Sequence, residues 1–595
     1  MEPQVTSNAK AISGQTFDYI VCGGGTSGCV IAAELASIPN VSVLLVEAGR
    51  DSGLAPDVLV PGKYVKQLQE DKEGLWELET IPQAQLNARK LVFVRGKQLG
   101  GSSAVNYMAL ARGPAADYDE WAKIVGEDGW KWKNILPLMR EVGILKRPVV
   151  KRVNRLGQLE DFDPKLPADL KQFAAPQSAD HGASGPLKIG FGGEMVSGIE
   201  TFVKACFENG IPLCPDINSG DPVGVGLAQF NVKDGERCYA ANAFLGESAR
   251  ASLKNLTIVT ETECDQLHSR DGVVTGVDLY HRPTGAQFHV YCREETVLCA
   301  GTFGSPRILM LSGLGPKDTL ERLDIPVQVD LPGCGQHMLD HSIITCEYKV
   351  KNSIPAHNQL FLNPGLLAEA EARIQRLFDS KEFSNLSTKE QEFLMEPTRP
   401  SAEIWLGSGP SVYRDNRPEE SYMTHELLLQ NNLSQGTVMV RSKNPRDNLI
   451  VHPNFMAHPF DRRTAIETVR MALKIASTEA YQDTIERMVH GPDIEFATAD
   501  LDTISDEVML DFIRKNLDQG YHSVSTCRMG KISDPEAVVD FRFQVKGMEN
   551  LRVADLSVCP ILTCNHTQIN AYLIGLRGAR EMVENHKART QLAKL

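Results

Sequence analysis

The 595-residue sequence lacks the features of a membrane or secreted protein. It has no uninterrupted apolar run of the roughly 18 or more residues that a membrane-spanning helix needs. Residues 1–15 are polar and contain no apolar signal-peptide core, so we expect no secretion. Lys and Arg number 62 against 76 Asp and Glu, and this net charge of −14 argues against a nucleic-acid-binding surface. We therefore expect an intracellular protein that binds neither nucleic acid nor a membrane.

The 13 cysteines follow neither a disulfide pattern nor a metal-binding pattern. Their number is odd and no Cys-x-x-Cys pair occurs, so we interpret them as small, buried apolar residues. Hydrophobic residues make up 42% of the chain and charged residues 23%, as is typical of folded globular proteins. The sequence contains no Gly-x-Ser-x-Gly elbow, and His522 and His566 lack a His, Cys and carboxylate cluster at ligand spacing. It therefore predicts no metal site and no serine hydrolase.

The clearest chemical motif is a glycine-rich turn near the N-terminus. An apolar strand at 17–22 precedes it, a small-residue helix at 29–37 follows it, and a second strand at 41–46 ends at Glu47. Gly-x-Gly-x-x-Gly at 23–28 within this βαβ unit is typical of dinucleotide binding, because the glycines let the backbone approach a pyrophosphate. The acidic residue after the second strand can accept hydrogen bonds from a ribose 2′-OH. A dinucleotide is therefore expected, although this motif does not distinguish NAD from FAD.

Two further segments have the composition needed to embed a flavin ring. The first, from Arg95 to Ala109, contains a Gly-Gly-Ser-Ser turn whose backbone N–H groups can face a flat ring or a phosphate. The second, at 301–315, follows a strand-like run at 296–300 and opens a helix with Gly, Ser and Pro. Because a nicotinamide enzyme usually needs only the first βαβ unit, these additional segments favour FAD.

These segments resemble the signature sequences of the glucose–methanol–choline (GMC) oxidoreductases, a family of FAD enzymes. Residues 301–315 are similar to the second family signature throughout, whereas the first signature matches from Gly96 to Asn106 and is looser afterwards. The resemblance covers essentially Phe17 to Val583, and its pattern is similar to that of fungal aryl-alcohol oxidase-like members. Shorter matches lie at 76–83, 181–186, 255–260 and 550–557.

The resemblance implies an α/β fold, α+β overall, with two domains. A Rossmann-like FAD-binding domain would be assembled from the discontinuous segments 1–145, 232–320 and 515–595. Residues 146–231 and 321–514 would form a substrate-binding domain with an antiparallel sheet backed by helices. Pocket residues are expected on that sheet, although the sequence alone does not orient them. We expect a monomer or a homodimer.

The resemblance also implies which residues contact FAD. Val105 stands where some choline-oxidising members carry a His that bonds covalently to FAD, so we expect non-covalent FAD. Ser523, Ser525 and Leu576 replace the residues that the family commonly has beside the ring. The expected cofactor-binding residues are Gly23, Gly25, Thr26, Ser27, Gly28, Glu47, Ala48, Trp76, Arg95, Gly100, Gly101, Ser102, Ser103, Asn106, Tyr107, Met108, Ala109, Cys264, Asp555, Leu556, Thr567 and Gln568.

Two histidines near the C-terminus are the candidate catalytic residues. The resemblance places His522 at the catalytic base and His566 at a second position where members carry His or Asn. The chemistry supports the same roles. A neutral imidazole can accept the hydroxyl proton near pH 7 while a hydride passes from carbon to flavin N5. A second imidazole can orient the hydroxyl and stabilise developing alkoxide charge.

We therefore predict an FAD-dependent oxidoreductase that converts the CH–OH group of an alcohol to an aldehyde or ketone, with O₂ as acceptor. Primary alcohols with aromatic or allylic activation are the expected substrates, and a fungal specialised-metabolite pathway is one setting for them. Two alternatives stay open, a dehydrogenase that uses another electron acceptor and a non-redox enzyme that resembles hydroxynitrile lyases.

The last three residues predict a location. Ala593-Lys594-Leu595 is similar to Ser-Lys-Leu, the C-terminal address that peroxisomal import receptors bind. We therefore expect a peroxisomal protein with such a receptor among its partners, and the cytoplasm is the alternative. A peroxisome also disposes of the H₂O₂ that an oxidase makes.

Overall fold

The computed structural model describes residues 4–53, 55–145, 150–153, 159–162, 180–191, 198–351, 363–367, 376–408 and 420–592. The predicted targeting tripeptide at 593–595 lies outside the described residues. Among the described residues, no helix is long and apolar enough to cross a membrane.

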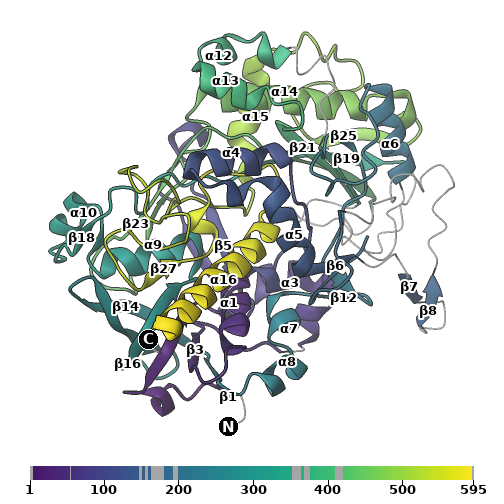
Figure 1. The fold of residues 1–595 in the computed structure, drawn as a ribbon. Coiled ribbons are helices and arrows are strands. Elements are labelled where there is room, and N and C mark those ends of the chain that lie inside the picture. The colour runs from purple at the N-terminus through teal and green to yellow at the C-terminus, as the bar shows by residue number, and fades with distance from the viewer. Residues whose placement is uncertain are drawn as a thin grey trace.

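The larger sheet is built from three distant parts of the chain (Figure 1). Its strand order is β1-β13-β3-β2-β16-β15-β14, and β27 also pairs with β16. The strands are β1 (Gln4–Thr6), β2 (Thr16–Cys22), β3 (Val43–Val46), β13 (Leu256–Val259), β14 (Thr262–Arg270), β15 (Val273–His281), β16 (Ala286–Leu298) and β27 (Leu551–Val553). The pairings from β1 through β16, and that of β16 with β27, are parallel. The predicted Rossmann-like sheet, assembled from discontinuous segments, is confirmed.

The first βαβ unit forms as its residue types predict. All four residues of β3 are buried, as expected for a central parallel strand covered on both faces. Helix α1 (Thr26–Ala36) begins directly after the glycine-rich turn, three residues earlier than the sequence suggests. It packs beside α16 (Gln568–Leu592), as Figure 1 shows. A Cβ atom on Gly575 would lie 2.9 Å from the Ser27 carbonyl oxygen, so glycine permits this close approach.

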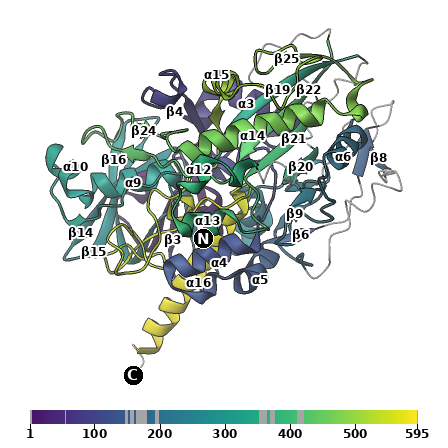
Figure 2. The same ribbon diagram turned by 90° about the horizontal axis from the view of Figure 1, so that it is seen from above.

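The second sheet is antiparallel and has the order β10-β20-β21-β22-β19-β25, with β26 paired to β19. Its strands are β10 (Gly224–Val225), β19 (Ser342–Val350), β20 (Asn363–Leu367), β21 (Ala402–Ser408), β22 (Tyr422–Leu429), β25 (Ile485–His490) and β26 (Asp518–Gln519). Helix α14 (Pro459–Ala476) packs on β22, β19 and β21, and Figure 2 shows it lying across these strands. The predicted antiparallel sheet backed by helices is confirmed.

The predicted domain limits can be compared with the two sheets. All strands of the larger sheet fall within 1–145, 232–320 and 515–595. The strands of the antiparallel sheet fall within 146–231 and 321–514, except β26. The limits themselves stay a prediction, and β26 shows that the C-terminal segment also contributes to the antiparallel sheet.

The remaining elements connect and cover the two sheets. The helices are α2 (Pro56–Leu59), α3 (Tyr64–Glu70), α4 (Ala115–Val125), α5 (Trp132–Val142), α6 (Ile199–Glu208), α7 (Ala240–Phe244), α8 (Glu247–Ser252), α9 (Gly301–Leu311), α10 (Lys317–Arg322), α12 (Lys381–Ser384), α13 (Thr388–Leu394) and α15 (Asp506–Asn516). The short strands are β4 (Leu75–Glu79), β5 (Val92–Gly96), β6 (Gly143–Leu145), β7 (Val150–Val153), β8 (Leu159–Phe162), β9 (Leu187–Ile189), β11 (Val232–Lys233), β12 (Glu236–Arg237), β17 (Leu314–Gly315), β18 (Val329–Asp330), β23 (Thr437–Met439) and β24 (Ile450–His452).

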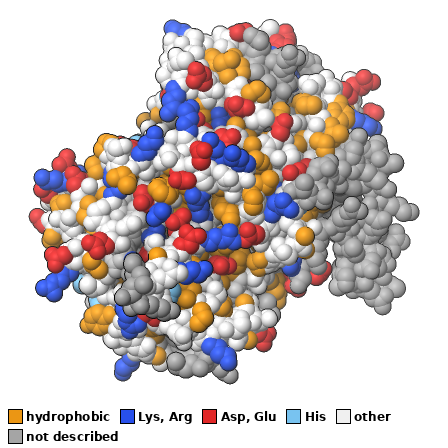
Figure 3. Space-filling view, in the orientation of Figure 1, with side chains coloured by type: hydrophobic (Ala, Val, Ile, Leu, Met, Phe, Trp, Pro, Cys, Tyr) orange, Lys and Arg blue, Asp and Glu red, His pale blue; other side chains and the backbone are white. Residues whose placement is uncertain are grey.

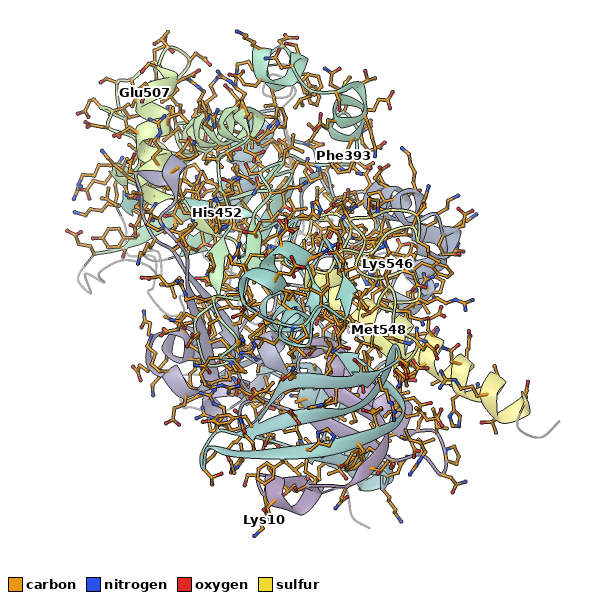
Figure 4. All side chains as sticks on the ribbon, turned by 90° about the vertical axis from the view of Figure 1, so that its left-hand side faces the viewer. Lys10, Phe393, His452, Glu507, Lys546 and Met548 are labelled. Atoms are coloured by element: carbon orange, nitrogen blue, oxygen red, sulfur yellow. The ribbon has the colours of Figure 1, made fainter. Side chains whose placement is uncertain are left out.

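The two sheets lie toward opposite ends of the molecule. In Figure 4, Lys10 marks the end with the larger sheet, and Glu507 and Phe393 mark the opposite end. On the face seen in Figure 3, acidic and basic side chains are interspersed rather than gathered by sign. The predicted site residues come from the larger sheet and from the segments that connect the two sheets.

Candidate active site

One cavity is lined by residues from both sheets and from the loops between them. The larger sheet contributes the turn after β2, the residues after β3, and the start of α9. The antiparallel sheet contributes Ile343, Trp405, Glu426 and Leu428. The cavity therefore joins the predicted cofactor segments to the predicted substrate sheet.

The structure brings most of the predicted site residues to this cavity. Both histidines line it, and so does every predicted cofactor residue except Gly28 and Gly100. A Cβ atom on Gly28 would lie 1.9 Å from the carbonyl oxygen of Gly23. Gly100 has φ +95°, and a Cβ there would lie 2.6 Å from the Tyr239 ring. These two glycines therefore permit close packing within the protein itself.

The glycine-rich turn leaves space that suits a pyrophosphate. Gly25 is the N-cap of α1 and lines the cavity, and the helix start has no side-chain cap hydrogen bond. A Cβ atom on Gly25 would meet no protein atom nearer than 3.9 Å, whereas one on Gly23 would lie 2.4 Å from the Cys299 carbonyl oxygen. Uncapped N–H groups at a helix N-terminus attract anions. The residues present therefore fit the phosphates of FAD.

Glu47 supports this turn through the backbone. Its Oε2 accepts a hydrogen bond from the N–H of Gly24 at 3.0 Å, and its Oε1 accepts one from Gly49 at 2.8 Å. Burial raises the pKa of Glu47 to about 7, although these backbone hydrogen bonds act in the opposite direction. The predicted bond to a ribose hydroxyl stays a prediction, and the structure adds a role in holding the glycine-rich turn.

His522 and His566 meet in the cavity although they come from separate segments. Their ring centroids are 4.8 Å apart and the rings are nearly perpendicular, at 83°. Nε2 of His566 lies 3.3 Å from Oε1 of Glu403, and the Trp405 ring packs edge-on against His566 at 5.0 Å. The other oxygen of Glu403 accepts a hydrogen bond from the Gln430 amide at 2.6 Å. Glu403 is therefore held where it can orient His566.

A third histidine, which sequence reasoning missed, contacts His522. The Nδ1 atoms of His341 and His522 are 2.9 Å apart, so one of them donates and the other accepts. His341 is completely buried, and burial followed by the nearby His566 lowers its pKa to about 3. No spacing in the sequence indicates this pair, because 181 residues separate its members.

Asp340 fixes the backbone at His522. One carboxylate oxygen accepts the His522 backbone N–H at 2.7 Å, and the other accepts the Ser523 hydroxyl at 2.6 Å. Arg95 donates to the same hydroxyl at 2.5 Å and lies 3.7 Å from the carboxylate. Burial raises the pKa of Asp340 to about 6 although Arg95 acts to lower it. Ser523, a departure from the family pattern, is thus part of a closed polar network.

The surroundings keep His522 unprotonated. Burial lowers its pKa well below the ordinary value of 6.5, and His566, His341 and Arg95 act in the same direction. A neutral imidazole is the form that can accept a proton. The site therefore combines a proton acceptor with a second imidazole beside it.

Outside the cavity, His268, Asp278 and His289 form a compact cluster on β14, β15 and β16. The Asp278 carboxylate lies 2.6 Å from Nε2 of His268 and 2.8 Å from Nδ1 of His289. These contacts are hydrogen bonds that satisfy the carboxylate within the protein. None of the three residues lines the cavity.

Comparisons with known proteins agree with this geometry. Two family profiles described as GMC oxidoreductase match residues 17–343 and 432–575. The chain is 30% identical over 592 residues to the glucose methanol choline oxidoreductase atC of Aspergillus terreus, covering 94% of this chain and 91% of that protein. It is 30% identical over 578 residues to an alcohol dehydrogenase (acceptor) of Pseudomonas putida, covering 95% and 96%. The crystal structure of pyridoxine 4-oxidase from Mesorbium loti superposes with a TM-score of 0.78 at 26% identity, covering 95% and 99%.

Proposed function

This chain belongs to the GMC oxidoreductase family and is an FAD-dependent oxidoreductase, and we propose that it oxidises the CH–OH group of a small-molecule alcohol to a carbonyl. The observation that carries the proposal is the neutral, partly buried His522 beside His566 in the cavity that the glycine-rich turn also lines. When bound, FAD supplies the hydride acceptor. The names of two similar proteins, an alcohol dehydrogenase and pyridoxine 4-oxidase, support an alcohol as substrate.

His522 is the base in this proposal, and His341 determines which of its nitrogens is free. The backbone carbonyls of Gln430 and Thr563 lie near the His341 ring and act to raise its pKa. Nδ1 of His341 faces Nδ1 of His522, so only one of these two atoms carries a proton, and Nε2 of His341 has no hydrogen-bond partner among the described residues. Assigning the proton of His341 to Nε2 makes its Nδ1 an acceptor for Nδ1–H of His522. Nε2 of His522 is then unprotonated and can accept the hydroxyl proton.

His566 orients the substrate hydroxyl in the same proposal. Glu403 and the edge of Trp405 hold the imidazole beside His522. A donor at this place stabilises the negative charge that develops on oxygen as the proton leaves. FAD is held without a covalent bond in this proposal, because the side chain of Val105 that lines the cavity is aliphatic.

The function is tested by mixing the holoenzyme anaerobically with a panel of primary aromatic, allylic and aliphatic alcohols. We expect at least one alcohol class to bleach the oxidised flavin absorbance. Rapid recovery in air with formation of H₂O₂ identifies an oxidase, and recovery only with a quinone identifies a dehydrogenase. A carbonyl product without bleaching would favour the lyase alternative. Failure of every alcohol to bleach the flavin would contradict the proposal.

The proposed base predicts an unusual pH profile for flavin reduction. Because the pKa of His522 is lowered, the base stays neutral as the pH falls through 6.5, so the reduction rate should show no decline there. Protonation of Asp340 near pH 6 removes a negative charge beside His522, which lowers its pKa further. The measurement is anaerobic stopped-flow reduction from about pH 8 to 5. Glu426, with a pKa of about 7, faces the same cavity.

A Glu426→Gln variant serves as the matched control for this profile. If the reduction rate of wild type declines near pH 7 and that of the variant does not, protonation of Glu426 causes the decline. A decline near pH 6.5 that persists in the variant would show that a histidine with an ordinary pKa limits the reaction.

A further inference from the structure

The register of the antiparallel sheet decides which side chains form the wall of the cavity. Side chains of register partners on neighbouring strands point to the same face of a sheet, and so do residues two apart on one strand. Across β19, β22 and β21, two adjacent rows on this face are Ile343, Leu428 and Glu403, and Thr345, Glu426 and Trp405. Because Ile343, Trp405, Glu426 and Leu428 line the cavity, the wall is apolar apart from one carboxyl.

Glu426 is buried in this wall without a polar partner. Its side chain faces the cavity, and only 8% of the residue is exposed. No hydrogen bond or ion pair joins its side chain to the residues that the structure describes, and the nearby His566 acts to lower the pKa of Glu426. A mostly buried carboxyl without a protein partner is unfavourable, since it has lost part of its hydration and gained no hydrogen bond from the protein. A ligand that supplies a donor would remove this cost.

Glu403, on the same face, differs from Glu426 in this respect. Both of its oxygens have partners, His566 at 3.3 Å and the Gln430 amide at 2.6 Å. One carboxyl of the face is therefore engaged in positioning the second histidine. The other is available to a molecule in the cavity.

We propose that Glu426 binds a hydrogen-bond donor of the substrate, a hydroxyl or ammonium group remote from the carbinol that is oxidised. This inference rests on the proposed function. Glu426 is the register partner of Trp405, whose ring contacts His566, so the carboxyl lies on the wall close to the histidine pair. The substrate class is then an alcohol with an apolar body, packed on Ile343, Trp405 and Leu428, and a second donor group.

The experiment compares three aryl alcohols of similar size. The probes are 4-(aminomethyl)benzyl alcohol, 1,4-benzenedimethanol and 4-ethylbenzyl alcohol. In the position para to the oxidised carbinol they carry an ammonium donor, a hydroxyl donor and no donor, respectively. For each, kcat/KM for flavin reduction and Kd from perturbation of the flavin spectrum are measured at pH 8 with wild-type holoenzyme, Glu426→Gln and Glu426→Leu. The ratio to 4-ethylbenzyl alcohol is the readout, because a general loss of activity or stability cancels in it.

We expect wild type to favour at least one donor-bearing probe by about 10- to 100-fold, as a hydrogen bond to a charged group allows. Glu426→Leu should abolish that preference. Glu426→Gln should abolish a preference for ammonium and keep part of a preference for hydroxyl, which distinguishes the two donors. The absence of any preference in wild type, or a preference that survives in Glu426→Leu, would overturn the inference.

The two proposals fail in different ways. The probes could bind with a donor preference that Glu426→Leu removes while none of them bleaches the flavin. That result would support the binding site at Glu426 and contradict oxidation of this class of alcohol. If 4-ethylbenzyl alcohol bleaches the flavin with the same efficiency as the other two probes, alcohol oxidation is supported and the proposed role of Glu426 is contradicted. Flavin content of both variants checks that each is folded and loaded.

Discussion

His522→Ala is expected to reduce flavin about 10²- to 10⁴-fold more slowly than wild type, the range lost with a general base, while the protein stays yellow. The imidazole is the proton acceptor of the proposed reaction, so its removal leaves the substrate hydroxyl without a base. The hydrogen bond from the backbone N–H of residue 522 to the Asp340 carboxylate is unaffected by the substitution. The measurements are the flavin spectrum of the purified variant and anaerobic stopped-flow reduction by the best alcohol of the panel.

Two variants make this result specific. His452, labelled in Figure 4, is a half-buried histidine on β24. It does not line the cavity, so His452→Ala should reduce flavin at the wild-type rate. His566→Asn keeps a polar group at the second position, so it should lose less than His522→Ala. A rate within about threefold of wild type for His522→Ala would remove His522 from the role of base. A colourless His522→Ala protein would instead indicate that the residue holds FAD.

The parts of the fold that the sequence predicted are those with local signals. The apolar run before the glycine-rich turn, the small residues after it and Glu47 at the next strand end are neighbours along the chain, and the structure has β2, α1 and β3 there. The three-part sheet followed from the family resemblance. The βαβ unit forms as predicted because its backbone geometry depends on nearby residue types, whereas the three-part sheet is confirmed by strand pairings between distant segments.

The contacts that the sequence missed depend on the register of distant strands. Asp340 and His341 directly precede β19, and their partners at 522 and 523 follow β26, with which β19 pairs. Glu426 is a single charged residue in an otherwise mostly apolar strand, which is a signal of function, but only its pairing with Trp405 shows which face it occupies. A period-2 pattern predicts alternation and cannot say which face is the cavity.

The glycines illustrate a second limit of sequence reasoning. Gly25 and Gly28 belong to one motif and receive the same interpretation from the sequence. In the structure, only Gly25 lines the cavity, whereas Gly28 allows α1 to pack on the preceding turn. The distinction depends on what a Cβ atom would meet, which no spacing reveals.

This difference gives the second large expected effect: Gly25→Val should fold and lose essentially all of its FAD. Gly25 has φ −77°, which valine can adopt, and its Cβ would be at least 3.9 Å from protein atoms. The valine methyl groups would therefore occupy the space that the pyrophosphate needs at the start of α1. The measurements are the flavin-to-protein ratio, circular dichroism and thermal unfolding. Acid precipitation of wild type should release its flavin to the supernatant, since the proposed FAD is non-covalent.

Gly28→Val is the matched control, because its Cβ would lie 1.9 Å from the Gly23 carbonyl oxygen and should prevent folding. Gly25→Ala adds one methyl group where no protein atom is close, so it should fold and bind FAD more weakly than wild type. A Gly25→Val protein with a full complement of FAD would place the pyrophosphate elsewhere. If Gly25→Ala failed to fold, Gly25 would be required by the protein itself, as Gly28 is. The pair thus separates a glycine that a ligand requires from one that the backbone requires.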